Sequence, residues 1–317
     1  MDILEHSLLS PGQVTRSVIT IGNFDGVHLG HRALLARVRE RARSLGAASI
    51  VYTFHPHPLK VLNPSFCPPQ LTCFEDRAAL IGAEGIDVLV WARFDREYAA
   101  QEPEIFARET LTERLGAAEV WVGPDFAFGR ARRGSLEVLR RLGSALGFDL
   151  CILEPFTLDG EVVSSTRIRQ AVAEADFSTA RRLLGRSYSL RGPVVHGAAR
   201  GQSLGFPTAN VLPREECLPM PGVYAAWAVT DGTRHAAAVN VGANPTFGAT
   251  ELTVEAYLLD YAGDLYGAEL EIVFVAAVRG EIAFRSPDDL IHQIHRDVDA
   301  IRAVLAAQEA HLPTEGP

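Results

Sequence analysis

Along the first half of the chain, short apolar runs alternate with longer stretches in which apolar residues recur every three or four positions. The short runs are rich in valine and isoleucine and predict β-strands, whereas the periodic stretches predict helices. The expected strands lie at 16–22, 48–54, 86–92, 118–123 and 149–155. The expected helices lie at 31–45, 75–84, 103–115 and 135–146. Such alternation is typical of a parallel sheet covered by helices, so the pattern predicts a doubly wound α/β domain.

The pattern changes near residue 164, where two short connecting helices are expected at 165–174 and 178–184. Beyond residue 186, β-rich segments separated by turn residues replace the helical spacing. They lie at 188–196, 222–230, 235–242, 252–260 and 270–278. The end of the chain returns to a helical period, with apolar residues at Leu290, Ile294, Val298, Ile301 and Leu305. We therefore expect two domains, 1–185 and 186–317, the second a small antiparallel β-barrel with a terminal helix packed on it.

The composition fits two globular domains and excludes several classes of partner. The 317 residues are 47% hydrophobic and 22% charged, as in ordinary soluble proteins. The net charge of −9 argues against broad charge-driven binding to nucleic acid or to an anionic membrane, although it permits local phosphate sites. No apolar stretch approaches the roughly 20 residues of a membrane helix, and the start of the chain lacks the features of a signal peptide. We expect a cytoplasmic protein, monomeric or weakly self-associating, without a nucleic-acid or membrane partner.

The string GNFDGVHLGH follows the first expected strand and leads into the first expected helix. In an open α/β sheet, ligands bind at the carboxyl ends of the strands, and N–H groups at a helix N-terminus bind phosphate oxygens. Gly22, Gly26 and Gly30 permit tight turns and close backbone approach. If the helix begins near the valine of this string, His28 and His31 share one face, where both can donate to the same phosphates. The alternative is a turn with two surface histidines. That interpretation would be favoured for an isolated HxxH, but the whole ten-residue string argues against it.

A second string, SSTRIR at 164–169, also begins an expected helix. Ser165 or Thr166 can serve simply as an N-cap, with the arginines on a solvated face. Two hydroxyl groups with Arg169 one turn further along also suit a polyphosphate, because arginine offers forked donors and the helix start offers backbone N–H groups. The string alone leaves these two interpretations equal.

In the second half, the glycine-rich strings GPVVHG and RGQSLG precede FPTAN. Glycine loops can wrap phosphates with backbone N–H groups, but barrels also need glycine at their corners. Thr208 and Asn210 are more informative, since their oxygen atoms are ligands of the type that Mg²⁺ prefers when it is shared with nucleotide phosphates. The region is not a Walker P-loop, because GxxxxGK[ST] is absent and Lys60 is the only lysine in the chain.

GNFDGVHLGH and SSTRIR together resemble the HxGH nucleotidylyltransferases, and the chain from about residue 17 to residue 305 resembles the prokaryotic bifunctional riboflavin kinase/FAD synthetases. The resemblance implies a Rossmann-like nucleotidylyltransferase domain that transfers AMP from ATP to FMN, releasing pyrophosphate and giving FAD. It also implies a riboflavin kinase domain that transfers the γ-phosphate of ATP to the ribityl 5′-hydroxyl, with Mg²⁺ as cofactor. The expected partners are therefore riboflavin, FMN, FAD and ATP.

For adenylyl transfer, the resemblance makes His28 and His31 the catalytic residues that stabilise charge on the ATP phosphates. ATP contacts are expected from residues of both strings, namely Gly22, Phe24, Asp25, Gly30, Ser165, Thr166 and Arg169. FMN contacts are expected from residues that follow the second and fourth strands, namely Phe54, His57, Asp125 and Phe128. Members of the family usually carry an acidic residue where this chain has His55, a departure that leaves His57 in register. Filling the core is the alternative for the aromatic rings.

For the kinase step, the resemblance makes Glu255 the base near the ribityl hydroxyl. In a strand, Thr253, Glu255 and Tyr257 share the face opposite the apolar residues between them, so an outward-facing glutamate on an amphipathic strand is the alternative. Thr208 and Asn210 are expected to hold Mg²⁺. Contacts to ATP or flavin are expected from Gly197, Arg200, Gly205, Pro207, Asn240 and Arg279.

Two other functions fit parts of the sequence. The first is a nucleotidylyltransferase with another acceptor, such as a phosphopantetheine or cytidylyl transferase, in which the barrel is a binding module. The kinase-type strings RGQSLGFPTAN and LTVEAYLLD argue against it. The second is a flavin-binding regulator without turnover. The joint presence of His28, His31, Thr208, Asn210 and Glu255 argues against that function.

Overall fold

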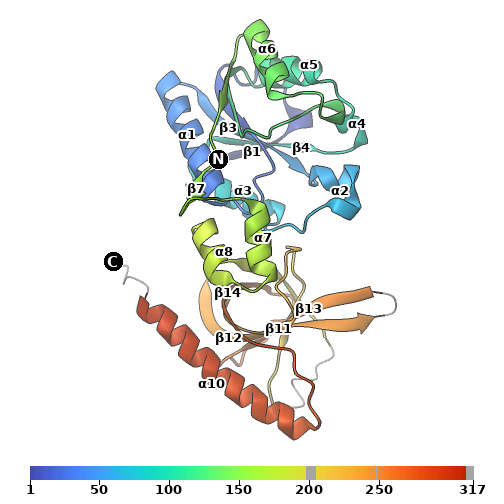
Figure 1. The fold of residues 1–317 in the computed structure, drawn as a ribbon, viewed down its shortest axis with the longest axis vertical. Helices are drawn as coiled ribbons and strands as arrows, with labels where there is room; N and C mark the ends of the chain where they lie inside the picture. The colour runs from blue at the N-terminus through green and yellow to red at the C-terminus, as the bar shows by residue number, and fades with distance from the viewer. Residues whose placement is uncertain (198–204, 247–248, 312–317) are drawn as a thin grey trace. The chain divides into compact units, whose positions relative to one another are not determined.

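The structure is a computed structural model of the full chain that describes residues 1–197, 205–246 and 249–311 (Figure 1). The chain divides into two compact units. The first comprises Met1–Pro68 and Cys73–Ser164, and the second comprises Pro69–Thr72 and Ser165–Pro317. Within the described ranges, no helix is both long and apolar enough to cross a membrane.

The first unit is built on a six-stranded parallel sheet with strand order β1-β4-β3-β2-β5-β6. The strands are β1 (Asp2–Glu5), β2 (Ser17–Ile21), β3 (Ala48–His55), β4 (Val88–Arg93), β5 (Ala117–Val122) and β6 (Asp149–Ile152). The helices are α1 (Leu29–Leu45), α2 (Pro58–Leu62), α3 (Phe74–Ala83), α4 (Arg96–Ala99), α5 (Pro103–Ile105) and α6 (Leu136–Leu146). The expected order of strands and helices is thus present.

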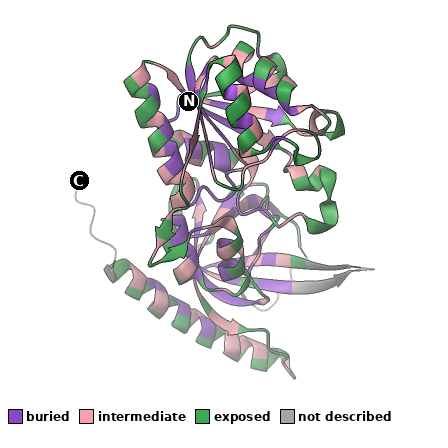
Figure 2. Cartoon of the chain, turned by 45° about the horizontal axis from the view of Figure 1, so that its top comes forward, coloured by how far each residue is buried: buried purple, intermediate pink, exposed green. Residues whose placement is uncertain are grey.

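Helices cover both faces of this sheet. Successive strand residues point to opposite faces. Val18 and Val51 pack with residues of α1 and α3 on one face. Ile19 and Ile50, which are the sequence neighbours of Val18 and Val51, pack with the helical segment 103–114 and with α6 on the other face. Figure 2 shows buried residues along the strands and exposed residues on the outer sides of the helices. This burial on two sides confirms the doubly wound α/β architecture.

Three features of the first unit differ from the sequence-based expectation. Strand β1 is not predicted by the pattern, yet it pairs in parallel with β4 at the edge of the sheet. The expected helix 103–115 is a short α5 continued by a π-helical segment, Phe106–Arg114. Beyond β6 the chain forms a small hairpin of β7 (Thr157–Leu158) and β8 (Glu161–Val162). None of these features changes the order of the expected elements.

The second unit is a closed antiparallel barrel with strand order β10-β13-β12-β11-β14-β9. Its strands are β9 (Ser189–Val195), β10 (Ala209–Val211), β11 (Gly222–Thr230), β12 (Thr233–Thr246), β13 (Ala249–Leu258) and β14 (Glu269–Gly280). The short strand β10, which the sequence pattern does not predict, pairs with both β9 and β13 and so closes the barrel. The predicted barrel is confirmed.

The terminal helix α10 (Pro287–His311) packs on the outside of the barrel, as expected. Ile301 and Leu305 of this helix are buried in a cluster with Val223 and Trp227 of β11. The indole nitrogen of Trp227 also donates a hydrogen bond to Gln308 Oε1 at 2.9 Å. Apolar burial and a polar anchor therefore fix the helix on one face of the barrel.

The connecting helices α7 (Ser165–Ala173) and α8 (Phe177–Leu184) belong to the second unit. Phe177 stacks on Phe274 of β14 with ring centroids 4.9 Å apart, and it meets the Tyr224 ring edge-on at 5.7 Å. The boundary between the two compact units therefore lies before α7, whereas the sequence pattern predicted a domain boundary after α8, at 185/186. The division of the two functions at 185/186 stays a prediction.

Candidate active sites

The first candidate site is the segment of residues 22–31, here called the histidine loop, which joins β2 to the first turn of α1. Three of its residues adopt left-handed backbone conformations, with φ of 51° at Phe24, 82° at Gly26 and 38° at Val27. This region is costly for a β-branched residue such as Val27. The Val27 side chain is buried against α1 and α3, and its N–H donates to the Phe24 carbonyl at 3.1 Å. Core packing thus holds an unfavourable turn in place.

His28 and His31 lie side by side at the start of α1. His28 is the N-cap of the helix, and its Nδ1 accepts a hydrogen bond from the His31 backbone N–H at 3.3 Å. The two rings stack with centroids 3.7 Å apart. A Cβ at Gly30 would lie 3.2 Å from His28 Nδ1, so glycine leaves the room that this ring occupies. The helix begins at Leu29, between the start near Val27 that the shared face assumed and the start at residue 31 that the apolar period predicted, and the two rings meet.

The local environment keeps His31 neutral. Burial, followed by the positive charges of His28 and Arg77, lowers the pKa of His31 well below its usual range. Its Nδ1 is buried, and among the described residues it has no hydrogen-bond partner. A neutral imidazole offers one N–H and one lone pair. His31 therefore presents a ring nitrogen whose hydrogen-bonding capacity the protein leaves unused.

Two further residues of the histidine loop, Phe24 and Asp25, are buried. Phe24 is only 2% exposed and meets the His31 ring edge-on at 5.2 Å. Asp25 is 3% exposed and interacts electrostatically with Arg77. The side chain of Phe24 belongs to the core, so the predicted ATP contacts at Gly22, Phe24 and Asp25 concern a loop whose side chains point largely inward.

Of the predicted FMN residues, His57 lies beside the histidine loop. Its Nε2 is 3.0 Å from Asn23 Nδ2, and its Nδ1 accepts a hydrogen bond from the Leu59 backbone N–H at 3.2 Å, capping α2. The ring is buried. Asp125, in the turn after β5, is exposed. The structure thus links His57 to the loop after β2 and leaves Asp125 at the surface.

The other two predicted FMN residues are aromatic and pack largely in the core. Phe54 meets the rings of Tyr52 and Phe94 edge-on, at 5.7 and 5.6 Å. Phe128 is 9% exposed and stacks on Phe126 at 5.6 Å. Both belong to the cluster on one face of the sheet. A structural role is therefore visible for both rings.

Ser165, Thr166 and Arg169 occupy the first turns of α7 in the second unit. Thr166 is exposed, and Ser165 is half-buried. The Arg169 Nε donates a hydrogen bond to the Pro69 carbonyl at 2.8 Å. This bond ties the segment Pro69–Thr72 to α7, so Arg169 has a structural contact as well as its predicted contact to phosphate.

The second candidate site lies on three neighbouring strands of the barrel. The pairing register places Glu255 of β13 opposite Asn210 of β10 on one side and opposite Asn240 of β12 on the other. Residues opposite each other in a sheet project from the same face. The hydroxyl of Thr208, just before β10, donates to Glu255 Oε2 at 3.4 Å. We call Thr208, Asn210, Asn240 and Glu255 the polar row.

Glycine makes room for the polar row. A Cβ at Gly197 would lie 2.2 Å from the Asn210 Nδ2, a separation that no packed structure tolerates. Glu255 itself is half-buried, whereas its neighbours Val254 and Ala256 are buried on the opposite face. The strand is thus amphipathic in the predicted sense, and its polar face carries a glutamate surrounded by other oxygen-bearing groups.

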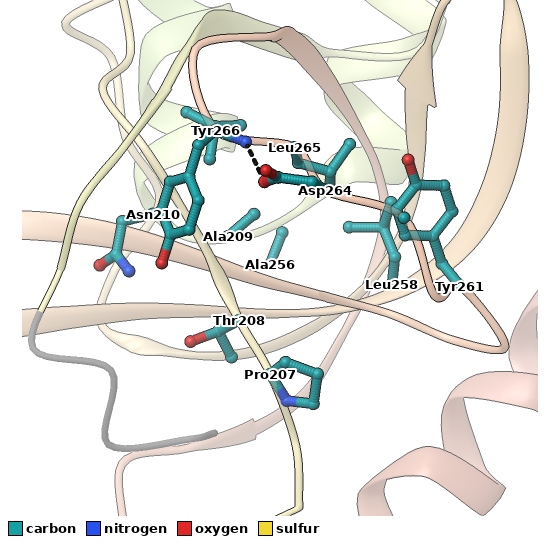
Figure 3. A pocket seen from close by; sticks show the side chains of 12 residues that line it. Pro207, Thr208, Ala209, Asn210, Ala256, Leu258, Tyr261, Asp264, Leu265 and Tyr266 are labelled. Carbon is teal, nitrogen blue, oxygen red and sulfur yellow. Dashed lines mark hydrogen bonds between the residues drawn. The ribbon is translucent and has the colours of Figure 1, made fainter. Parts of the chain in front are cut away.

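A cavity of about 210 Å³ lies next to the polar row (Figure 3). Thr208 and Asn210 line it together with Pro207 and residues of the loop between β13 and β14. In that loop, Asp264 Oδ1 accepts a hydrogen bond from the Tyr266 N–H at 3.0 Å, and the Tyr266 ring stacks on His196 at 4.1 Å. The cavity is lined by Val194, Pro207, Thr208, Ala209, Asn210, Ala256, Leu258, Tyr261, Gly263, Asp264, Leu265 and Tyr266. Polar and apolar groups therefore meet where a flavin or nucleotide is expected.

The remaining predicted kinase residues are distributed differently. Arg279 forms a bidentate ion pair with the buried Asp297 of α10, with Nε 3.1 Å from Oδ1 and Nη2 2.8 Å from Oδ2. This pair gives Arg279 a structural role, and its contact to ligand stays a prediction. Gly205 is exposed with φ of 88°, a conformation that favours glycine. Arg200 lies outside the described residues.

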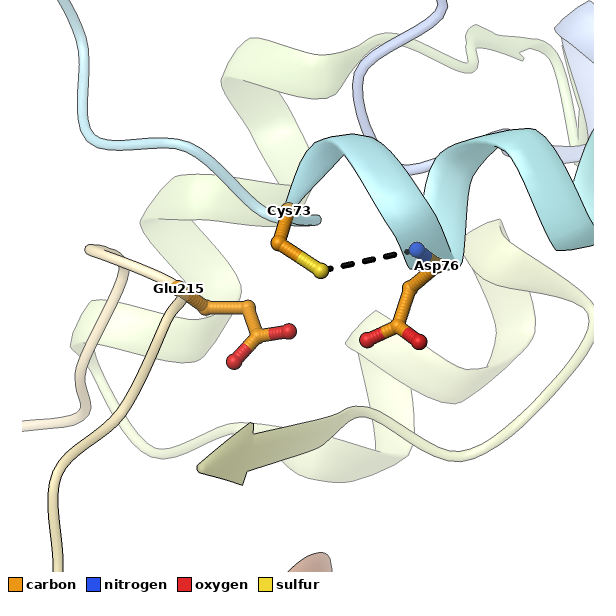
Figure 4. Close-up of side chains that lie close together, drawn as sticks. All are labelled: Cys73, Asp76 and Glu215. Carbon is orange, nitrogen blue, oxygen red and sulfur yellow. Dashed lines mark hydrogen bonds between the residues drawn. The ribbon is translucent and has the colours of Figure 1, made fainter. Parts of the chain in front are cut away.

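One buried polar residue near the histidine loop was missed by the sequence reasoning. Arg77 lies on α3, whose first turn is capped by Cys73, with Sγ accepting from the Asp76 N–H at 3.4 Å (Figure 4). Arg77 is 3% exposed and shares the buried side of α3 with Ala78 and Ile81. An arginine within the apolar stripe of an amphipathic helix was the available signal, because a buried charge requires specific partners.

Comparisons with known proteins identify a family for each half of the chain. The chain matches the family model described as FAD synthetase over residues 11–167 and the one described as riboflavin kinase over residues 184–305. It is 41% identical over 295 residues to a bifunctional riboflavin kinase/FMN adenylyltransferase of Pseudomonas fluorescens, covering 93% of this chain and 94% of the relative. The Escherichia coli K12 protein of the same name is 38% identical over 281 residues, covering 88% and 90% of the two chains.

Among solved structures, a crystal structure described as a macrolide-efflux protein from Streptococcus pneumoniae superposes with a TM-score of 0.83. It is 28% identical in sequence and covers 95% of this chain and 99% of that chain. The two family models span both units, and the curated relatives match across nearly their full length. The chain therefore belongs to the bifunctional riboflavin kinase/FMN adenylyltransferase family, whose two activities phosphorylate riboflavin to FMN and adenylylate FMN to FAD with ATP.

Proposed function

We propose that adenylyl transfer takes place at the histidine loop and that riboflavin phosphorylation takes place at the polar row. The observation that carries this assignment is that two separate groups of chemically suitable side chains are present. The first sets two stacked histidines at a helix N-terminus, and the second sets a threonine hydroxyl on a glutamate flanked by two asparagines. One enzyme thus performs two successive steps at two separate sites.

At the histidine loop, His28 and His31 stabilise the charge that develops on the ATP phosphates. The N-terminus of α1 adds a favourable field for anions. The nucleophile is the phosphate of FMN, which is already an anion, and it displaces pyrophosphate at the α-phosphorus of ATP. No covalent enzyme intermediate is required, so positioning and electrostatic stabilisation supply the rate.

The other predicted residues of this step bind its two substrates. Ser165, Thr166 and Arg169 hold the β- and γ-phosphates of ATP, while Gly22, Phe24, Asp25 and Gly30 shape the turn that receives the nucleotide. FMN binds against His57, Asp125, Phe54 and Phe128. The hydroxyls at the start of α7 and the unused Nδ1 of His31 support this distribution.

At the polar row, Glu255 accepts the proton of the ribityl 5′-hydroxyl as that oxygen attacks the γ-phosphorus of ATP, and ADP leaves. The hydrogen bond from the Thr208 hydroxyl at 3.4 Å orients the carboxylate. The cavity beside Thr208 and Asn210 receives the substrates. Gly197, Arg200, Gly205, Pro207, Asn240 and Arg279 complete the predicted binding surface.

The residues of the polar row fit Mg²⁺. The Thr208 hydroxyl donates a hydrogen bond to Glu255, which leaves its oxygen lone pairs for a cation, and the absence of a Cβ at Gly197 leaves the space that the Asn210 amide occupies. Hydroxyl and amide oxygens are suitable ligands for Mg²⁺ that is shared with phosphates. When bound, Mg²⁺ neutralises charge on the phosphates of ATP. Thr208 and Asn210 would hold it.

We further propose that the enzyme works in the cytoplasm as a monomer or a weak homo-oligomer. Its partners are riboflavin, FMN, FAD and ATP, with no nucleic acid and no membrane. The net charge of −9 supports this, because it opposes broad attraction to polyanions.

A flavin product assay tests the assignment. The purified chain, given riboflavin, ATP and Mg²⁺, forms FMN and then FAD, which chromatography resolves. The double variant His28→Ala/His31→Ala is expected to stop at FMN. The double variant Thr208→Ala/Asn210→Ala is expected to leave riboflavin unchanged yet to convert supplied FMN to FAD. His292→Ala, at an exposed histidine of α10, is the control and is expected to retain both steps. Loss of both steps in either double variant, with folding intact, contradicts two separate sites.

A further inference from the structure

A buried arginine on α3, Arg77, connects the histidine loop to the end of strand β3. Its Nη1 donates to the Asn23 carbonyl at 2.9 Å, and its Nη2 donates to the Phe54 carbonyl at 3.2 Å. Asn23 lies in the histidine loop just after β2, and Phe54 lies at the end of β3. One guanidinium group therefore bridges the carboxyl ends of two adjacent parallel strands, the edge where an open α/β sheet binds its ligands.

The geometry of this bridge requires arginine. The guanidinium is a rigid planar fork with several N–H donors, so it can hold two carbonyls at a fixed separation. A lysine ammonium keeps the charge but offers no fork. The Asn23 carbonyl precedes Phe24, where the left-handed part of the histidine loop begins. The bridge thus anchors the loop immediately before its strained turn, at the end of the loop that leaves β2, whereas α1 begins at the other end.

The charge of Arg77 is also placed where it influences the site. The guanidinium is 3% exposed, lies 5.6 Å from the centre of the Phe74 ring and interacts with the carboxylate of Asp25. Burial lowers the pKa of Arg77, and Asp25 raises it, but arginine remains charged at neutral pH. This charge contributes, after burial and His28, to the lowered pKa of His31.

We propose that Arg77 is a positioning residue for adenylyl transfer, which fixes the histidine loop against the end of β3 and thereby sets where His28 and His31 meet the ATP phosphates. This inference rests on the proposed function of the histidine loop. Arg77 itself touches no reacting atom in this scheme. It acts through the Asn23 and Phe54 carbonyls and through the electrostatic effect of its charge on His31.

The first test compares Arg77→Lys with Arg39→Lys. Arg39 is a matched control, because its Nη1 also donates to a backbone carbonyl, that of Glu84 at 2.5 Å, but away from the histidine loop. In Arg77→Lys, kcat for FAD formation from FMN is expected to fall at least about tenfold, since misplacement of catalytic groups by about 1 Å can cost up to about 10²-fold. KM for FMN and ATP should change far less than kcat. Riboflavin phosphorylation by the same sample reports on the integrity of the second unit and should be unchanged.

The second test uses pH, which a purely structural role would not alter. The groups that face His31 are His28, Arg77 and the ring of Phe24. Removing the charge in Arg77→Met raises the pKa of His31, so the acid limb of the kcat profile for FAD formation should move to higher pH. In Arg77→Lys, which keeps the charge, the limb should stay at the wild-type pH. If Arg77→Met does not fold, NMR titration of the His31 ring in Arg77→Lys and in the wild-type protein replaces it. The pKa of His31 is then expected to be the same in both proteins.

Several results overturn the inference. It is wrong if FAD formation by Arg77→Lys stays within about twofold of wild type, a change too small for displaced catalytic groups. It is also wrong if Arg39→Lys loses as much activity, or if only KM changes. An acid limb that does not move in Arg77→Met removes the electrostatic part of the inference. Failure of the proposed function looks different, because His28→Ala/His31→Ala would then still form FAD.

Discussion

The two proposed sites of this chain differ in the kind of backbone that positions their side chains. In the first unit, the proposed catalytic side chains lie on a loop with left-handed residues, where a helix cap, a ring stack and hydrogen bonds from a buried arginine hold the loop. In the second unit, they stand on adjacent strands, and their positions depend on the register of the barrel. Loop-built sites are sensitive to the groups that hold the loop, whereas strand-built sites are sensitive to anything that intrudes on the strand surface.

The largest expected effect separates the two sites completely. Glu255→Gln removes the proton acceptor of the polar row while keeping its size, so riboflavin phosphorylation should fall by about 10²–10⁴-fold, the usual contribution of a general base. FAD formation from supplied FMN should be unchanged, and chromatography of the flavins measures both rates. Glu269→Gln, at an exposed glutamate of the same barrel, is the control. An equal loss of FAD formation in Glu255→Gln would show that the sites are not independent.

A smaller effect tests how the strand-built site depends on space. In Gly197→Ala the new Cβ would lie 2.2 Å from Asn210 Nδ2, so the amide must move. Riboflavin phosphorylation should drop by up to about 10²-fold, as displacement of a positioning group does. Gly280→Ala is the control, since nothing lies within 4 Å of its added Cβ. Steady-state kinetics of both variants decide the matter, and equal activity in the two would rule out crowding of Asn210.

A stability measurement tests what fixes α10 on the barrel. In Asp297→Ala, Arg279 loses a bidentate partner whose carboxylate is only 6% exposed. Loss of one partner of a buried pair costs about 3–5 kcal/mol, and the partial exposure of Arg279 brings the expectation to about 2–3 kcal/mol. Asp260→Ala, which breaks an exposed pair with Arg302, should cost less than about 1 kcal/mol. Urea unfolding followed by fluorescence compares the two, and similar losses would deny Arg279 its structural role.

The smallest effect concerns pH and the first unit alone. Burial, assisted by Arg114, lowers the pKa of His6 from 6.5 to about 4, while Glu5 opposes the shift. As the pH falls, His6 of the unfolded chain is protonated at a higher pH than His6 of the folded chain. Protonation therefore favours the unfolded state, so the free energy of unfolding is unaffected by His6 above pH 6.5 and decreases as the pH falls toward 4. Because the ring is partly open to solvent, the change should not exceed about 2 kcal/mol.

The control for this pH effect is His6→Gln, which has no titrating group at the position. Hydrogen exchange of the first unit, followed between pH 4 and 7, should show a shallower loss of protection in His6→Gln than in the wild-type protein. The rings of Tyr52 and Tyr98, which meet His6 edge-on, remain in both proteins. Identical profiles would mean that other groups carry the acid sensitivity of this unit.

The sequence predicts what depends on local pattern and misses what depends on distant packing. Period-two and period-3.6 spacing identified the main strands and helices, and the alternation at Glu255 correctly gave its face. Strands β1 and β10 were missed because four and three residues carry too little pattern, and each exists only through its neighbours. The helical period of α8 is clear, yet nothing local states that Phe177 stacks on Phe274.

The same limit applies to the candidate sites. Motif resemblance located His28, His31, Thr208, Asn210 and Glu255, and the structure brings the first two together and aligns the last three. The motif resemblance could not distinguish binding roles from structural roles for Phe128 or Arg279, because these roles depend on contacts that only the folded chain forms. Arg77 was missed because only the fold brings the Asn23 and Phe54 carbonyls to one guanidinium.

Because β10 has only three residues, formation of the proposed kinase site depends on how this strand pairs. This strand is the seam between β9 and β13, and Asn210 lies within it, directly after Thr208. Its pairing with β13 spans more than forty residues of sequence, so the seam is a long-range contact of the slow-forming kind. A barrel in which every other strand has paired still lacks the polar row. At the proposed kinase site, riboflavin phosphorylation therefore requires that β10 has paired with β9 and β13, so this activity would report complete folding of the barrel.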